Sequence, residues 1–191
     1  MLDSPVRGND TQKEIKMKKA LWFVLVGLVL TSSYLYATED HDHPAPYVGS
    51  AEFERMKGLA GTWKGTHEMA GNPSSEATVE YSVTSNGSAV VEKLFPGTPH
   101  EMISVYHDKS GKLAMTHYCG LGNRPEMKSV SSTPNEIKLD FSGPSDIDVA
   151  KDAHMHALTL TFDGDILIQN WSYYKDGADA GTTTITLTRA S

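Results

Sequence analysis

Short runs of alternating apolar and polar residues fill the chain from Trp63 to its C-terminus. In the last run, threonines at every second position alternate with Ile185, Leu187 and Arg189. A period of two places successive side chains on opposite faces of a β-strand. The pattern therefore predicts an all-β domain of ten strands, over residues 62–69, 76–84, 87–95, 101–107, 112–119, 126–131, 136–142, 154–162, 165–174 and 182–189.

The segments between these runs carry turn residues. Asn86-Gly87 and Asp163-Gly164 are pairs typical of tight hairpins, because glycine and asparagine tolerate positive φ. Ten strands joined by hairpins leave two exposed edges unless the sheet closes. We therefore expect an antiparallel meander barrel wide enough to hold an interior cavity. A two-sheet sandwich is the alternative, although it usually needs crossovers instead of hairpins.

The first 37 residues have the pattern of a cleavable signal peptide. Lys18 and Lys19 precede an apolar run over residues 20–30, and small and polar residues follow up to Ala37. The run is shorter than the ~20 residues that a membrane span needs. We expect translation to start at Met17 and cleavage to follow Ala37, which predicts a periplasmic or secreted protein. Retention of the segment as an anchor is the alternative.

Three segments follow from these patterns: residues 1–37 as extension and signal peptide, 38–50 as a flexible leader, and 51–191 as the barrel domain. A short helical turn is expected over residues 52–59, immediately before the first strand.

The chain has 191 residues, of which 39% are hydrophobic and 21% charged, and this ordinary globular composition argues against global disorder. Its formal net charge is −7. The negative charge argues against nucleic-acid binding and against electrostatic docking on anionic lipid. After cleavage no stable membrane anchor is expected. Cys119 is the single cysteine, so no disulfide forms within the domain and its core must stabilise it alone.

Two groups of residues resemble known families. Leu59-Ala60-Gly61-Thr62-Trp63, together with Arg189, resembles the lipocalin and fatty-acid-binding superfamily. In that superfamily a tryptophan on the first strand packs under an arginine from the last, a favourable cation–π contact. The segments 116–119, 122–123 and 152–156 are similar to a bacterial family of exported, lipocalin-like domains of unknown function. This resemblance covers residues 52–191 and implies a barrel with a small-molecule ligand, without an established activity. The haem-binding members of the superfamily have a glycine-rich first strand and a haem-ligating histidine. Neither feature has a clear counterpart in this chain, so haem is not expected and the cofactor is left unassigned.

Two histidines are the first candidate ligand-binding residues. His154 and His156 lie two residues apart on one predicted strand and so share a face. With Asp163-Gly164 as the pivot of the hairpin, His156 pairs with Trp171 and His154 with Tyr173. Because the neighbouring positions on this face are apolar, we expect the two histidines to form a polar patch inside the barrel, where such groups orient ligands.

His117 and Cys119 share a face of another strand, with Tyr118 between them. If that face also points inward, His117, Cys119, His154 and His156 line one lumen. Imidazole and thiolate suit zinc, copper or iron, so this set is an alternative metal site. Two other interpretations stay open: ligand orientation without a metal, and ordinary semi-buried side chains.

Arg124 lies in a glycine-containing loop and is a candidate for bidentate binding of a ligand carboxylate, or an ordinary exposed arginine.

The chain lacks a nucleophile elbow, a Walker loop, a dinucleotide fingerprint and a zinc-protease motif. Three function classes remain: a barrel that binds a small, partly apolar molecule, an enzyme with a histidine base, and a structural domain with a filled core.

Overall fold

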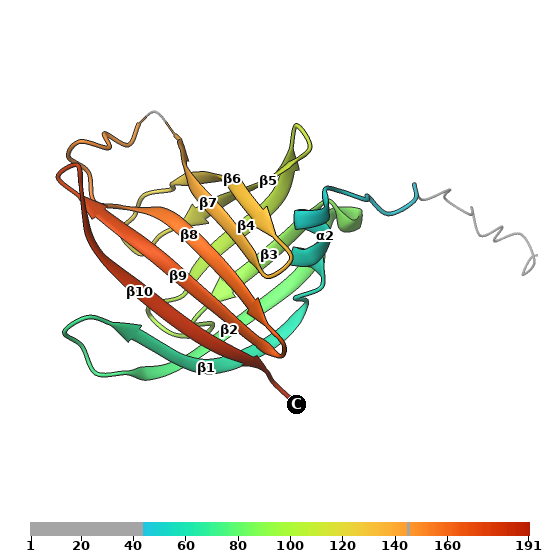
Figure 1. Cartoon of the computed structure of the whole chain (residues 1–191), viewed down its shortest axis with the longest axis horizontal. Helices are drawn as coiled ribbons and strands as arrows, with labels where there is room; N and C mark the ends of the chain where they lie inside the picture. The colour runs from blue at the N-terminus through green and yellow to red at the C-terminus, as the bar shows by residue number, and fades with distance from the viewer. Residues whose placement is uncertain (1–43, 145) are drawn as a thin grey trace, which may run out of the picture. The chain divides into compact units, whose positions relative to one another are not determined.

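The computed structural model describes residues 44–144 and 146–191, so the predicted signal peptide and residues 38–43 of the predicted leader lie outside the described residues. Within them, ten strands form one closed antiparallel barrel. Each strand pairs with its neighbours in sequence, and β1 pairs with β10 (Figure 1). The strands are β1 (Gly61–Met69), β2 (Ser75–Thr84), β3 (Ala89–Leu94), β4 (Met102–Lys109), β5 (Lys112–Tyr118), β6 (Glu126–Thr133), β7 (Glu136–Gly143), β8 (His154–Asp163), β9 (Ile166–Lys175) and β10 (Ala178–Arg189). The predicted ten-stranded meander barrel is confirmed.

Helix α2 (Ala51–Lys57) covers one end of the barrel, beside the tight turns that follow β2, β4, β6 and β8 (Figure 1). Ser50 caps the helix by accepting a hydrogen bond from the Phe53 amide at 3.2 Å. Phe53 and Met56 are fully buried and belong to the hydrophobic core. The opposite end, called the loop end below, holds the segments 70–74, 95–101, 119–125, 146–153 and 176–177.

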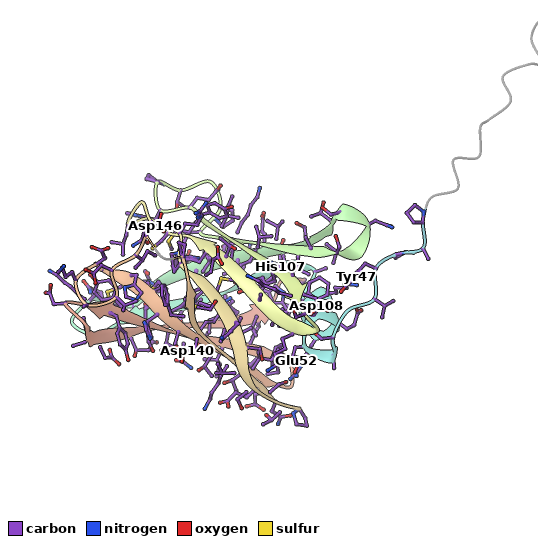
Figure 2. All side chains as sticks on the ribbon, turned by 90° about the horizontal axis from the view of Figure 1, so that it is seen from above. Tyr47, Glu52, His107, Asp108, Asp140 and Asp146 are labelled. Carbon is purple, nitrogen blue, oxygen red and sulfur yellow. The ribbon has the colours of Figure 1, made fainter. Side chains whose placement is uncertain are left out.

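Residues just before α2 are hydrogen-bonded to the same end of the barrel. The Tyr47 amide donates to the Asn86 carbonyl at 2.9 Å. The Ser50 hydroxyl donates to an Asp108 carboxylate oxygen at 2.6 Å. Figure 2 shows Tyr47 and Asp108 near one another at this end. These contacts attach the last residues of the predicted leader to the turns of β2–β3 and β4–β5.

The barrel closes where its first and last strands meet. Trp63 pairs with Arg189, and the guanidinium carbon of Arg189 lies 4.6 Å from the centroid of the Trp63 ring. The same guanidinium donates to the carbonyls of Ala60 at 2.7 Å and Gly58 at 2.9 Å. The predicted contact between indole and guanidinium is therefore present, and it ties the end of β10 to the segment between α2 and β1.

The turn between β2 and β3 differs from the expected two-residue hairpin. Thr84 pairs with Ala89, which leaves a four-residue loop. Ser85, Asn86 and Gly87 have φ values of 53°, 50° and 81°. The positive φ expected at Asn86 and Gly87 is confirmed, and Ser85 adopts it too. The Ser88 hydroxyl and amide both donate to the Ser85 carbonyl and close the loop.

Buried side chains fill the middle of the barrel. The core draws on α2 and on most strands, and Val79, Leu158, Leu160 and Leu187 are among its fully buried members. Within the described residues, no helix has the length and hydrophobicity to cross a membrane.

Candidate functional site

A buried carboxylate lies in the core of the barrel. Glu92 on β3 is fully buried, and its two neighbours on the same face, Val90 and Leu94, are apolar core residues. Burying a charge without partners is costly, so such a group needs hydrogen-bond donors around it. The structure supplies those donors from three other strands.

Three side chains donate hydrogen bonds to Glu92. The hydroxyl of Tyr81 lies 2.7 Å from Oε1, and the hydroxyl of Tyr106 lies 2.9 Å from Oε2. Gln169 Nε2 lies 2.6 Å from Oε1. Ser104 pairs with Glu92 across β3 and β4 and helps to lower its pKa.

Burial and hydrogen bonding act on this cluster in opposite directions. Removal from water raises the pKa of Glu92, and hydrogen bonds from Tyr81, Ser104, Tyr106 and Gln169 oppose that rise. The pKa values of Tyr81 and Tyr106 are well above the ordinary value because both phenols are buried, and the nearby Glu92 carboxylate raises them further. Both phenols therefore stay protonated as donors.

The cluster extends toward the loop end through His117. Ser104 Oγ lies 3.0 Å from Nδ1 of His117, whose ring centroid is 4.8 Å from that of Trp171. The Trp171 indole donates to Gln169 Oε1 at 3.0 Å, and Gln169 in turn donates to Glu92. Of the candidates named from the sequence, His117 and Trp171 are thus brought into direct contact. Burial lowers the pKa of His117 to about 4, so its imidazole is neutral at pH 7.

This low pKa predicts a pH-dependent stability. Because the pKa of folded His117 is about 4 against an ordinary 6.5, the unfolded chain binds more protons between these values. The free energy of unfolding should therefore fall by up to about 3 kcal/mol from pH 7 to pH 4 through this group, and be level above that window. Urea unfolding of wild type and His117→Phe at both pH values measures the difference.

The matched change at exposed His100 is the control, since His100→Phe should keep the wild-type pH dependence. Equal pH dependence of wild type and His117→Phe would contradict the assignment to His117.

Above this cluster, a cavity of about 400 Å³ opens at the loop end. Strand β9 connects the two, because Gln169, Trp171 and Tyr173 alternate on one face, and Tyr173 lines the cavity. Most of the lining is apolar or aromatic, and the residues are Met69, Ala70, Leu121, Met155, Tyr173, Ala180, Gly181, Thr182 and Thr183.

A second cavity of about 650 Å³ shares Met69 with the first. His67 and Phe95 line it, with ring centroids 5.3 Å apart. The Thr183 hydroxyl donates to the Glu68 carbonyl, so it accepts from His67 Nε2 at 2.7 Å. A mainly apolar wall with a few fixed polar groups is typical of small-molecule sites.

The predicted pairing of the two strand histidines is wrong. Asp163 pairs with Ile166, and a bulge lies between Met155 and Ala157. As a result Trp171 pairs with Leu158, Tyr173 with Met155, and Tyr174 with His154. The extra residue of a bulge shifts every later side chain along the strand. Met155, and neither histidine, therefore lines the cavity.

The two histidines instead form a cluster with other partners. His154 Nδ1 donates to the Asp152 carbonyl at 2.7 Å, and its Nε2 lies 3.0 Å from His156 Nδ1. His156 stacks on Tyr174, with centroids 3.9 Å apart, and its Nε2 lies 3.5 Å from Asp140. Burial lowers the pKa of His156, and Asp140 opposes that shift.

The alternative metal set is not assembled. In the part of the chain that the structure describes, no group of three or more His, Cys, Asp or Glu side chains is placed to hold a metal ion. His117 contacts Ser104 and Trp171, whereas His154 and His156 contact each other. His117 and the pair of His154 and His156 therefore belong to separate sets of contacts.

The remaining candidates lie at the loop end or on the outside. Tyr118 is 51% exposed, because alternation on β5 turns it away from the face of buried His117. Cys119 is partly buried, and burial raises the pKa of its thiol. Arg124 is exposed and lines a separate polar cavity of about 620 Å³ with Asp146 and Asp152.

Sequence reasoning missed the centre of the buried cluster: Tyr81, Glu92, Ser104, Tyr106 and Gln169. One signal was available, because Glu92 occupies the alternate position between Val90 and Leu94 on an otherwise apolar face. A charged residue within such a row indicates either an outward face or a buried polar network. Only the contacts across the barrel distinguish the two.

A comparison with protein-family models and with curated proteins finds no match for this chain. The fold and the site geometry therefore carry the functional argument.

Proposed function

We propose that this protein is an exported, lipocalin-like barrel that binds a small, partly apolar molecule in the cavity at its loop end. The observation that carries the proposal is the stacking of two layers inside one barrel. An apolar cavity lies at the rim, and a fully buried polar cluster lies directly below it on the alternating face of β9. A ligand with an apolar body and a polar end matches both layers.

The shape and chemistry of the rim support this assignment. Met69 and Met155 are unbranched and adapt to ligands of different shape. The neighbouring cavity lined by His67 and Phe95 adds room for a longer or branched molecule.

Export is supported by the charged and apolar pattern of the first 37 residues.

An enzymatic role with His117 as general base has less support. A base works best when its pKa is near the working pH, whereas burial holds the pKa of His117 at about 4. A neutral, weakly basic imidazole is better suited to accept or donate a fixed hydrogen bond.

The binding proposal is tested with the fluorescent apolar probe N-phenyl-1-naphthylamine. Wild type should enhance its fluorescence saturably, and Met155→Glu should weaken binding by at least about tenfold, because it places a charge in the apolar wall. The same substitution at exposed Val130 on the outside of β6 is the matched control and should leave the affinity unchanged.

Equal affinities of wild type and Met155→Glu would place the probe elsewhere and contradict the proposed site. The intact mass of protein purified from the organism that encodes it tests export in the same preparation, since the mature chain is expected to begin at Thr38.

A further inference from the structure

The hydrogen bonds of Thr183 determine which nitrogen of His67 carries a proton. A threonine hydroxyl has one hydrogen, and that of Thr183 is donated to the backbone carbonyl of Glu68 at 3.1 Å. The Thr183 oxygen is therefore the acceptor toward His67 Nε2, 2.7 Å away. Burial lowers the pKa of His67, so its ring is neutral at pH 7. The hydrogen then lies on Nε2, and Nδ1 has the lone pair.

This lone pair is weakly occupied and faces an open site. Nδ1 lies 3.4 Å from the Ser75 hydroxyl, which is longer than a strong side-chain hydrogen bond. Ser75 is exposed, so its hydroxyl can turn to water when a better donor arrives. His67 itself is half-buried and lines the cavity of about 650 Å³ at the loop end. A molecule in that cavity can therefore reach Nδ1.

The aromatic wall beside His67 is held in an uncommon backbone conformation. Phe95 has a φ of 54°, which is rare for a bulky residue, and a following proline, here Pro96, favours an extended backbone. The Phe95 amide donates to the Thr78 carbonyl at 2.9 Å, and its own carbonyl accepts from the Thr98 hydroxyl at 2.8 Å. The Phe95 ring lies at 72° to that of His67. Strain held in this way is typical of ligand sites.

The hydrogen-bonded pair of His67 and Thr183 lies where the two loop-end cavities meet. Thr183 lines the apolar cavity of about 400 Å³, and His67 lines the larger one. Met69 lines both. A ligand whose apolar body fills the smaller cavity therefore has a fixed acceptor, His67 Nδ1, available at its boundary with the larger one.

We propose that His67 Nδ1 accepts a hydrogen bond from the ligand, and that the site therefore selects molecules with an O–H or N–H donor on an aromatic or other apolar body, such as phenols. This inference rests on the proposed binding function and adds the chemical class of the ligand. A site built around a hydrogen-bonding group discriminates against analogues that lack the matching partner.

Two probes of nearly equal shape test it, and the fluorescence of each naphthalene reports its binding. 1-Naphthol carries the hydroxyl donor, and 1-methoxynaphthalene does not. Wild type should bind 1-naphthol about fivefold more tightly, the ratio that one neutral hydrogen bond supports. His67→Phe should bring the ratio of the two dissociation constants to about one. His107→Phe, a matched change at a half-buried histidine on β4 that lines neither cavity, should preserve the wild-type ratio.

The outcomes separate the two proposals. Equal binding of both naphthalenes to wild type, or an unchanged ratio in His67→Phe, would overturn donor selection and leave the binding function standing. Saturable binding of N-phenyl-1-naphthylamine without binding of 1-naphthol would have the same meaning. Binding of none of the three probes would overturn both proposals.

His67→Phe is expected to fold, because the Thr183 hydroxyl keeps the Glu68 carbonyl as its acceptor. Should it fail to fold, nitrogen NMR of histidine-labelled wild type at pH 8 decides. An unprotonated His67 Nδ1 whose resonance shifts with 1-naphthol, and not with 1-methoxynaphthalene, supports the inference. A protonated Nδ1, or equal shifts with the two probes, overturns it.

Discussion

Replacing Glu92 with alanine is expected to lower the free energy of unfolding by about 4 kcal/mol, because it leaves buried donors without an acceptor. The phenols of Tyr81 and Tyr106 and the amide of Gln169 all donate to this carboxylate inside the core. None of them can turn to water, since all three residues are buried. Urea unfolding followed by tryptophan fluorescence measures the loss.

Two further variants establish that the donors, and not the lost volume, cause the effect. Glu80→Ala changes an exposed glutamate on β2 and should cost less than about 0.5 kcal/mol. Combining Glu92→Leu with Tyr81→Phe and Tyr106→Phe removes two of the donors along with their acceptor. It should be less destabilising than Glu92→Ala, because matched apolar replacement of a buried polar group is nearly neutral. The reverse order would contradict this explanation.

Replacing Gly65 with alanine is expected to destabilise the barrel by about 4 kcal/mol, at the high end of single substitutions. Gly65 lies on β1 and pairs with Leu187 on β10, where the sheet closes. A Cβ atom at this position would overlap the carbonyl oxygen of Thr186 and lie 3.1 Å from the Leu187 Cα atom. These are backbone atoms, so relief requires β1 and β10 to separate. Thermal or urea unfolding measures the effect.

The matched control is Gly120→Ala, in the loop after β5. There an added Cβ would lie 3.7 Å from the Met102 sulfur, an ordinary contact with a flexible side chain. This variant should differ from wild type by less than about 0.5 kcal/mol. If Gly65→Ala were as stable as Gly120→Ala, the close approach of β1 and β10 would not be a constraint on the fold.

Local patterns predicted the fold well. Nine of the expected strands begin and end within two residues of the observed ones, and the tenth begins four residues earlier than expected, at Ala178. Alternation and turn residues act over a few positions, so they are visible in the sequence. The contact between Trp63 and Arg189 was also predictable, but from resemblance to a superfamily and not from local pattern.

The candidate site was predicted less well, because its geometry depends on register. The bulge between Met155 and Ala157 brings Met155 to the cavity in place of the histidines beside it. A bulge has no reliable sequence signal here, and one inserted residue reverses which side chains face inward. His117 and Trp171 were both named as candidates, yet their contact with Glu92 through Ser104 and Gln169 was not foreseen.

By itself the sequence determined that this chain folds as a ten-stranded antiparallel meander, since each hairpin is encoded by a short alternating run and its turn. Only the tertiary structure decided which of the many polar residues meet inside it. Tyr81, Glu92 and Tyr106 lie on the neighbouring strands β2, β3 and β4, and Tyr81 pairs directly with Glu92. Gln169 comes from β9, and the closed barrel brings its side chain across to the same carboxylate. Contacts across a closed barrel depend on the stagger of all ten strands together, which no single run of residues encodes.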